Sequence, residues 1–325
     1  MSTGVDSLVE GVLAGDPRAV ARAISLVEDG RPELERLSAG IFDRTGRAAT
    51  IGLTGAPGVG KSTLAGGLVA VARARELRAA VLAVDPTSPY TGGALLGDRV
   101  RMQEHATDPG VFIRSMATRG HLGGMALAAP EAVRILDAAG YDRVIVETVG
   151  VGQAEVDVAA ATDTAVVVLA PGMGDAVQIA KAGILEIADV FVVNKADRDG
   201  ADDVMRDLRQ MLHLGEARAW EPPVLTTTAT GGPAGGGVGE LWDAVEAHRA
   251  WLTGSGALDA KRRARLLREV ESLAAARFRV TAAAALAGDG GLADDLLQRR
   301  IDPYRAASKL LGAVGSDGGP QEAGP

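Results

Sequence analysis

Short runs of consecutive apolar residues, rich in Val and Ile, alternate along much of the chain with stretches whose apolar residues recur every three or four positions. The first pattern is typical of strands buried on both faces of a sheet, and the second of amphipathic helices. Strands that alternate with helices in this way predict an α/β fold with a doubly wound, mostly parallel sheet. The predicted strands lie at residues 49–54, 79–85, 111–115, 143–147, 165–169, 190–194 and 224–228.

Helical spacing dominates both ends of the chain. Residues 7–44 predict three short helices, and Asp16 before Pro17 predicts an N-cap followed by a first-turn proline. After the last strand we expect a helix at 240–252, one long Arg-rich helix at 257–287 and a second helix at 292–311. The glycine-rich stretch 231–239 predicts a mobile surface loop, and the tail beyond Val314 predicts disorder.

These elements predict four parts of the chain. An N-terminal helical segment covers residues 1–47 and one large α/β domain covers residues 48–254. A C-terminal helical arm follows at 255–315, and a disordered tail at 316–325. A chain of 325 residues is long enough for such a domain with helical additions.

Composition narrows the classes of function. The chain has no cysteine, which excludes disulfides and thiolate metal sites and predicts a reducing compartment, the cytoplasm by default. No apolar run approaches the roughly 20 residues that span a bilayer, so we expect no membrane insertion. The formal net charge of -8 disfavours nucleic acid as a partner, because that binding relies on Lys and Arg.

A phosphate-binding loop follows the first predicted strand. Residues 55–62 fit the pattern G-x-x-x-x-G-K-[ST], and a helix is expected to begin near Ser62. Glycines in such a loop let backbone N–H groups surround a phosphate, and the helix N-terminus adds its positive dipole end. Lys61 would bridge the β- and γ-phosphates, and the Ser62 hydroxyl would bind Mg²⁺. The predicted nucleotide-binding residues here are Gly55, Ala56, Pro57, Gly58, Val59, Gly60, Lys61, Ser62 and Thr63.

Two acids end apolar strands. Asp85 follows the apolar residues 81–84, and Glu147 follows residues 144–146. Because the carboxyl ends of parallel strands share one edge of a sheet, both acids can approach the same Mg²⁺, although either alone could be a strand-end cap. Glu147-Thr-Val-Gly150 also stands where GTPases place a glycine whose N–H meets the γ-phosphate. We therefore assign Lys61, Asp85, Glu147 and Gly150 to the catalytic group.

A base-reading tetrapeptide, Asn194-Lys195-Ala196-Asp197, follows the sixth predicted strand. The Asp197 carboxylate can accept from guanine N1–H and N2–H₂, and adenine lacks this pair of donors. Asn194 would brace the loop, and the stem of Lys195 would cover the ring. Thr228-Ala229-Thr230 ends the last strand and is similar to the loop whose backbone amide meets guanine O6. The chain is therefore predicted to bind and hydrolyse GTP, with GDP as product, through a domain at 48–254.

Taken together, the motifs resemble those of the MeaB and ArgK type GTPases of the SIMIBI class. Members of that family act as chaperones of adenosylcobalamin-dependent acyl-CoA mutases such as methylmalonyl-CoA mutase. The resemblance covers roughly residues 5–310, and its most specific part lies between Asp85 and Met102. The chain departs from the family in the glycine-rich loop and in Ser115-Met116-Ala117. The matching runs are residues 84–89, 92–102, 118–124, 147–155 and 171–175.

The resemblance implies further roles. It adds Asp98 to Ser62, Asp85 and Glu147 as residues of the Mg²⁺ site. It implies that residues 172–183 report the nucleotide state to a mutase, and that a second mobile loop holds Arg119 and His121. The reporting segment would act through Asp175, Gln178 and Lys181. It also implies a homodimer formed through the C-terminal helices, and control of cobalamin loading, protection or rescue. We expect hydrolysis to be slow until a partner binds, because the sequence offers no obvious arginine finger or glutamine base.

Other interpretations stay open. Without the family, Asp98 is a turn residue, 172–183 is an ordinary loop and the long helix packs on its own domain. A P-loop ATPase or small-molecule kinase, the label attached to the ArgK name, would need ATP preference, against which the tetrapeptide argues. A nickel metallochaperone of the same class would need Cys or His clusters, whereas this chain has no Cys and four His.

Overall fold

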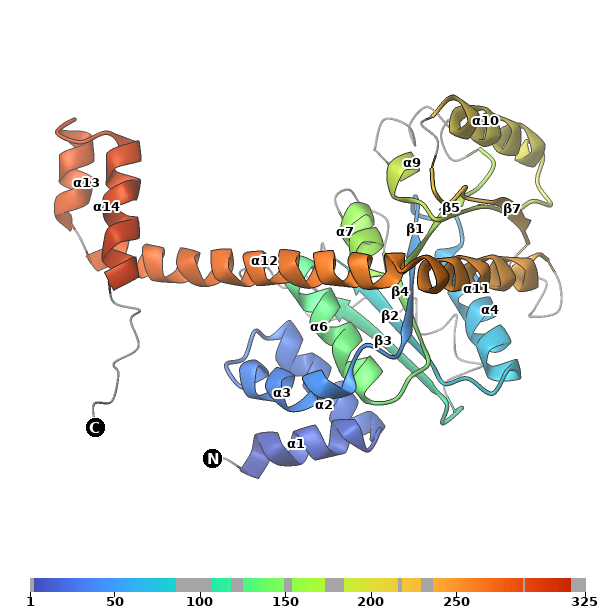
Figure 1. The fold of residues 1–325 in the computed structure, drawn as a ribbon, viewed down its shortest axis with the longest axis horizontal. Coiled ribbons are helices and arrows are strands. Elements are labelled where there is room, and N and C mark those ends of the chain that lie inside the picture. Colours follow the sequence, from blue (N-terminus) through green and yellow to red (C-terminus); the bar gives the residue numbers. More distant parts are fainter. Residues whose placement is uncertain are drawn as a thin grey trace. The chain divides into compact units, whose positions relative to one another are not determined.

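The computed structural model describes residues 3–85, 107–117, 125–148, 154–172, 184–215, 218–228, 236–288 and 290–316. The chain forms two compact units, Met1–Leu266 and Leu267–Pro325. Figure 1 labels the elements of both units. The division of the chain into four parts remains a prediction. Disorder in the tail also remains a prediction, because α14 runs to Ser316 and residues 317–325 lie outside the described ranges.

A seven-stranded sheet forms the centre of the first unit, in the order β3-β2-β4-β1-β5-β6-β7, and every strand pair is parallel. The predicted doubly wound fold is confirmed, and the predicted bounds differ from the observed ones by at most two residues. The strands are β1 (Ala49–Thr54), β2 (Ala79–Asp85), β3 (Val111–Ala117), β4 (Arg143–Thr148), β5 (Thr164–Leu169), β6 (Val190–Asn194) and β7 (Val224–Thr227).

Helices cover both faces of this sheet because successive strand residues point to opposite sides. In β2, Leu82 packs with the N-terminal helices and α6, whereas Val81 packs with α4 and α11. At β6, Phe191 and Val193 pack against α10. The helices of this unit are α1 (Thr3–Leu13), α2 (Pro17–Glu28), α3 (Leu34–Ile41), η1 (Phe42–Arg44), α4 (Lys61–Ala74), α6 (Met125–Ala138), α7 (Ala154–Ala161), α9 (Ile184–Ile187), α10 (Ala201–Leu214) and α11 (Val238–Ser255).

The three predicted N-terminal helices are present as α1, α2 and α3. Asp16 caps α2 as predicted, because its carboxylate accepts from the backbone N–H groups of Arg18 and Ala19, and Pro17 occupies the first turn. Figure 1 shows these helices beside α6. They bury Val20, Ile24 and other apolar residues in one cluster with β2, β3 and β4, so they extend the core of the first unit.

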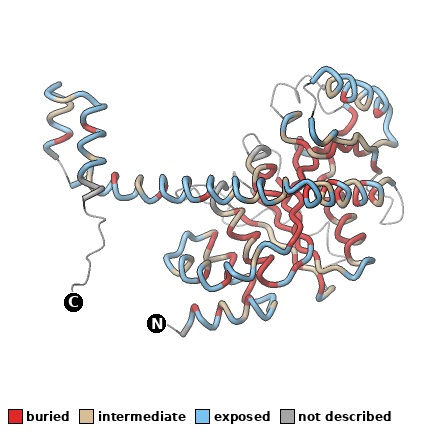
Figure 2. Tube along the Cα trace, in the orientation of Figure 1, coloured by how far each residue is buried: buried red, intermediate tan, exposed pale blue. Residues whose placement is uncertain are grey.

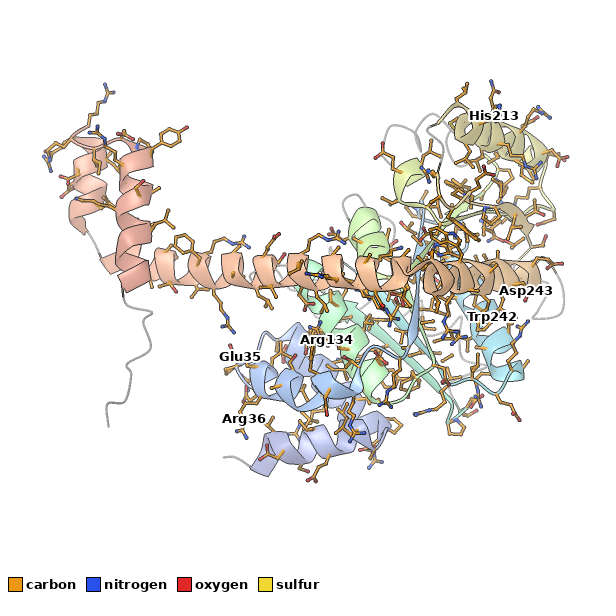
Figure 3. The ribbon with its side chains drawn as sticks, in the orientation of Figure 1. Glu35, Arg36, Arg134, His213, Trp242 and Asp243 are labelled. Carbon is orange, nitrogen blue, oxygen red and sulfur yellow. The ribbon has the colours of Figure 1, made fainter. Side chains whose placement is uncertain are left out.

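Helix α11 attaches to the sheet through a large aromatic side chain. Trp242 is buried with residues of α4, and the guanidinium groups of Arg75 and Arg143 lie 5.2 and 5.6 Å from its ring centre. Figure 3 labels Trp242 and its exposed neighbour Asp243, which forms an ion pair with Arg75. Apolar burial therefore fixes α11 on the sheet.

The described part of the second unit is helical. Helix α12 (Ala257–Gly288), which begins in the first unit, is one long helix as predicted, but the single helix predicted at 292–311 is wrong. Two helices occur instead, α13 (Gly290–Leu297) and α14 (Pro303–Ser316). Pro303 fits the first turn of a new helix, and the Asp302 carboxylate accepts from the N–H groups of Tyr304 and Arg305. Figure 2 shows that α13 and α14 are mostly exposed.

Within the described part of the chain, we find no helix whose length and apolar character suffice to cross a bilayer.

One buried histidine links α11 to the amino ends of two strands. His248 Nδ1 lies 2.9 Å from the Thr164 hydroxyl, and its Nε2 lies 3.4 Å from the Asp189 carboxylate. The ring centres of Trp220 and Trp251 lie 4.9 and 5.7 Å from the centre of the imidazole ring. Burial lowers the pKa of His248, and the nearby charge of Lys261 adds to this, while Asp189 and Asp163 oppose it.

We expect acid to destabilise the first unit through His248. Because its pKa is lowered on folding, the unfolded chain takes up this proton first as the pH falls below about 6.5, so the stability present above that pH is lost. The free energy of unfolding, obtained from thermal unfolding curves, should fall more steeply from pH 8 to pH 5.5 in the native chain than in His248→Gln. The two slopes should differ by at most about 1.4 kcal/mol per pH unit. His213→Gln, which removes an exposed imidazole, should match the native slope. Equal slopes in all three proteins would contradict the assignment.

Candidate functional site

The loop between β1 and α4 has backbone geometry that side chains would prevent. Gly55, Gly58 and Gly60 have φ values of 140°, 79° and 100°. A Cβ on Gly55 would lie 2.1 Å from the carbonyl oxygen of Val168, and a Cβ on Gly60 would lie 2.3 Å from Nδ2 of Asn194. Glycine is therefore required at both positions by close approach as well as by φ.

This loop ends in a helix N-terminus that can bind an anion. Gly60 precedes the first turn of α4 and, as a glycine, makes no side-chain cap there. The backbone N–H groups of a helix N-terminus and its dipole favour an anion at this position. The Lys61 side chain is buried, and its ammonium donates to the carbonyl oxygens of Gly55 at 2.6 Å and Ala56 at 3.0 Å. The loop thus places the Lys61 ammonium beside the N-terminus of α4, and a cation combined with a helix N-terminus favours binding of phosphate.

Ser62 and Glu147 meet beside the loop. The Ser62 hydroxyl, from the first turn of α4, donates to Oε1 of Glu147 near the end of β4, and both side chains are buried. A hydroxyl and a carboxylate are hard oxygen ligands of the kind that Mg²⁺ prefers. The donor set fits Mg²⁺ completed by phosphate and water. Among the described residues, no group of three acidic or histidine side chains could hold a metal by itself.

Asp85 ends the strand next to β4. In the register of the sheet, Ala83 lies opposite Glu147 and Val84 lies opposite Thr148, so Asp85 stands one residue further toward the same edge. Its backbone is described, but its side chain is not. The predicted ligand Asp98 and the predicted γ-phosphate contact Gly150 both lie outside the described residues.

The base-reading tetrapeptide contacts the phosphate loop directly. Nδ2 of the buried Asn194 donates to the carbonyl oxygen of Val59 at 2.8 Å, across 135 positions of sequence. The Lys195 ammonium donates to the carbonyl oxygen of Gly58 at 2.6 Å. Lys195 has a φ of 57°, and Asp197 is exposed beyond it. The structure therefore brings together two motifs that the sequence located separately.

Thr227 was missed by the sequence analysis, which selected Thr228, Ala229 and Thr230. The Thr227 hydroxyl donates to Oδ1 of Asn194 at 3.0 Å, and the residue is only 1% exposed. Thr227 and Asn194 are register partners in β7 and β6. The run of three threonines at 226–228 gives no local signal for which hydroxyl points inward, because that depends on the register of two strands.

Several predicted residues lie outside the described ranges. Thr228 is described, and its backbone N–H donates to Gly236, but its two successors are not described. Pro171 and Gly172 end the described chain after β5, so only the first residue of the expected reporting segment is described. The remaining predicted residues outside the described ranges are Ala229, Thr230, Arg119, His121, Asp175, Gln178 and Lys181.

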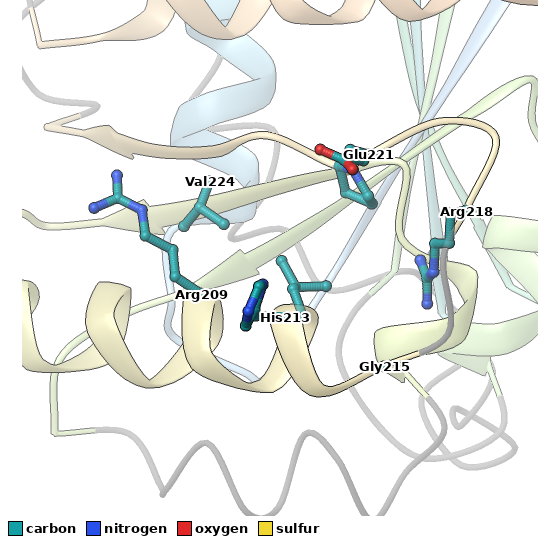
Figure 4. A pocket seen from close by; sticks show the side chains of 8 residues that line it. Arg209, His213, Gly215, Arg218, Glu221 and Val224 are labelled. Carbon is teal, nitrogen blue, oxygen red and sulfur yellow. The ribbon is translucent and has the colours of Figure 1, made fainter.

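A surface cavity of about 460 Å³ beside α10 contains none of the predicted residues. Figure 4 shows Arg209 and His213 of α10 on one side of it and Glu221 and Val224 on the other. The Arg218 guanidinium at its end donates to the carbonyl oxygens of Leu185 and Ala188, so it stabilises the chain before β6. This cavity is separate from the phosphate loop.

Comparisons with known proteins find similarity to GTPases. A family model described as methylmalonyl Co-A mutase-associated GTPase MeaB matches residues 20–287. A putative GTPase of Pyrococcus horikoshii is 49% identical over 311 residues, which cover 94% of this chain and 97% of the relative. The GTPase ArgK of Escherichia coli is 39% identical over 253 residues, covering 75% of this chain and 76% of the relative.

Two further matches are more distant. The mouse protein named methylmalonic aciduria type A homolog, mitochondrial, is 36% identical over 277 residues, covering 79% of this chain and 66% of the relative. A solved structure titled LAO/AO transport system kinase superposes with a TM-score of 0.69 at 25% identity, covering 97% of this chain and 99% of that chain.

Replacing Thr227 by Val should weaken binding of GDP about tenfold or more. The change keeps the shape of the side chain but removes the hydroxyl that donates to Oδ1 of the buried Asn194, at a cost of about 1–3 kcal/mol. Calorimetric titration with GDP and Mg²⁺ measures the affinity, and thermal unfolding shows whether the fold persists. Thr226→Val is the matched control, because Thr226 is exposed and should bind as the native chain does. If both variants bind equally, Thr227 does not support Asn194.

Proposed function

The chain belongs to the MeaB family of methylmalonyl Co-A mutase-associated GTPases, and from this premise we propose that it uses GTP to control adenosylcobalamin in an acyl-CoA mutase. The family resemblance and the GTPase activity predicted from the sequence are confirmed by these matches. We propose loading, protection or rescue of the cofactor as the finer role. The family description and the name of the mouse relative support a mutase as the partner.

The contact of Asn194 with Val59 and Thr227 carries the nucleotide assignment. It holds the segment that would read the base against the loop that would hold the phosphates. We propose that the N–H groups of residues 55–63 surround the β-phosphate and that Lys61 turns from the loop carbonyls to the β- and γ-phosphates. Lys61 already lies within the loop, so this requires only a change of its side-chain torsions.

We propose that Ser62 and Glu147 serve the magnesium site with Asp85 and Asp98. The direct contact of the first two supports this, as does the position of Asp85 on the neighbouring strand. When bound, Mg²⁺ neutralises charge on the β- and γ-phosphate oxygens. The chain's own residues orient the triphosphate and keep its γ-phosphate facing the end of β4, where Gly150 would donate its N–H.

Guanine would be read at the end of β6 and β7. The Asp197 carboxylate would accept from N1–H and N2–H₂, the stem of Lys195 would cover the ring, and the segment Thr228 to Thr230 would offer a backbone N–H to O6. Support comes from the bond of Lys195 to the phosphate loop and from the register of Asn194 with Thr227. These contacts hold the tetrapeptide against the phosphate loop.

We propose that a second copy of the chain binds the second unit. Leu297, Tyr304 and Leu311 of α13 and α14 are large apolar residues that are 82%, 87% and 56% exposed. Exposed apolar residues gathered on a small helical unit favour association with another apolar surface. We propose a homodimer formed through these C-terminal helices, with residues 172–183 reporting the nucleotide state to the mutase.

An ATP-dependent kinase is the second candidate, because the matched structure is titled a transport system kinase. This function needs adenine in the base site and an acceptor for the phosphoryl group. Asp197 disfavours it, since adenine presents an acceptor at N1 where guanine presents a donor. Competition between ATP and GTP for the purified chain separates the two candidates.

Asp197→Asn should lower affinity for GTP about 100-fold or more and raise affinity for xanthosine triphosphate. The amide replaces one acceptor by a donor, which opposes guanine N2–H₂ but matches the xanthine 2-carbonyl, and unpaired polar groups in such sites cost large factors. Competition against a fluorescent GDP analogue measures both affinities. Asp199→Asn is the control, because Asp199 is also exposed but lies beyond the tetrapeptide. Unchanged preference in Asp197→Asn would remove this residue from the base site.

A cognate acyl-CoA mutase should raise the GTPase turnover of this chain about tenfold or more, which corresponds to about 1.4 kcal/mol of transition-state stabilisation. We expect the isolated chain to be slow, because partner-supplied groups commonly complete such sites. Phosphate release is measured with and without each candidate mutase, and Ser62→Ala serves as the inactive control. If the isolated chain hydrolyses GTP but no mutase binds it or changes the rate, the chaperone role fails while the GTPase assignment stands.

A further inference from the structure

Two aspartates stand at the edge of the sheet opposite the nucleotide loops. Asp163 immediately precedes β5 and Asp189 immediately precedes β6. The side chain of Asp163 is only 4% exposed. Its carboxylate also accepts from the backbone N–H of Thr50, at the start of β1. These acids therefore belong to the amino ends of the strands whose carboxyl ends lead to the candidate site.

Three cations of α12 meet these two acids. Arg262 Nη2 lies 2.7 Å and Arg265 Nη2 lies 3.2 Å from the Asp163 carboxylate, while Lys261 Nζ lies 3.1 Å from Asp189. Their spacing, i, i+1 and i+4, places them on one side of the helix. This side of α12 is therefore complementary in charge to the amino edge of the sheet.

The same cations also bind backbone carbonyls at this edge. Lys261 donates to Asp163 at 2.7 Å, Arg262 donates to Ala48 at 2.9 Å and Gly46 at 2.5 Å, and Arg265 donates to Ala161 at 2.9 Å. Each cation thus bonds both a carboxylate and at least one carbonyl. A guanidinium group can do this because its N–H donors form a fixed fork.

Apolar burial contributes little to this attachment. None of the side chains from 257 to 266 is buried, and Leu266 is 40% exposed. Helix α11 differs, because Trp242, Val245 and Leu252 are buried in it. Detaching residues 257–266 would therefore expose no core residue of that segment, and its docking depends on charge.

We propose that residues 257–266 form an electrostatic strap that docks on Asp163 and Asp189 and detaches reversibly while the sheet stays folded. This proposal does not depend on whether the chain serves a mutase, since the strap uses no residue of the nucleotide site. Burial alone would raise the pKa of Asp163, but the hydrogen bond from Arg262 and the charges of Arg265 and Arg262 outweigh it and lower that pKa. The carboxylate is therefore ionised at neutral pH, where the strap is docked.

The position of the strap in the chain gives it a consequence. Helix α12 continues from the strap to Gly288, and the second unit begins at Leu267, directly after the last residue of the strap. Release of the strap would therefore detach from the sheet edge the amino-terminal part of a helix that continues into that unit.

Hydrogen exchange of the full chain with GDP and Mg²⁺ tests this proposal. Backbone amides of residues 260–266 should exchange about tenfold or more faster in Asp163→Asn than in the native chain. Raising KCl from about 0.05 M to about 0.5 M should speed their exchange about fivefold in the native chain and little in the variant, because salt screens the ion pairs. Amides of β1 and β5 should keep their protection, and GDP affinity should stay within about twofold, since the sheet remains folded.

Two further variants keep the result decisive. Arg262→Gln with Arg265→Gln removes the charges from the helix side, so its effect should equal that of Asp163→Asn even if the aspartate variant is unstable. Asp108→Asn is the matched control, because it breaks a partly buried ion pair with Arg73 elsewhere in the same unit. The proposal is overturned if native exchange rates persist in both strap variants, or if the strap loses protection only together with β5.

Discussion

The buried amide of Asn194 is the interaction on which the site depends. Its Nδ2 donates to Val59 in the phosphate loop, and its Oδ1 accepts from Thr227 on the neighbouring strand. A buried amide with both ends paired holds its position, whereas one left unpaired costs free energy. Gly60 makes this contact possible, because any side chain there would collide with the amide nitrogen. One side chain thus fixes the relation of three segments that are distant in the sequence.

The parallel sheet explains why these segments meet. All seven strands of the described sheet run the same way, so their carboxyl ends, including those of β1 and β6 that lead to the phosphate loop and the tetrapeptide, lie at one edge. At this edge the Ser62 hydroxyl donates to Glu147, and the Lys61 ammonium donates to backbone carbonyls of the phosphate loop. A phosphate can compete for the Lys61 ammonium because the neutral carbonyl oxygens that it now contacts are weaker acceptors than a charged phosphate oxygen.

The sequence predicted the elements better than the contacts between them. Strands buried on both faces are nearly continuous apolar runs, so their positions could be found locally, and the glycine pattern of residues 55–62 carries its own spacing. Thr227 could not be selected, because its role follows from the pairing of β6 with β7. The break between α13 and α14 was missed although Asp302-Pro303 offers a start signal, because apolar spacing continued across it. The pairing of Asp163 with Arg262 has no local signal at all.

At both edges of the sheet, cationic side chains pair with the groups that the strand ends leave without strand partners. At each edge, strands stop and leave carbonyls and buried acids that need partners, and cations supply them. At the carboxyl edge the cation is Lys61 on a glycine loop, and at the amino edge the cations belong to α12. Between the edges, β5 and β6 are buried on both faces by apolar residues, which resist deformation. A change in the strap therefore need not disturb the nucleotide site, and a helix attached mainly by charge can move while the rest of its domain stays ordered.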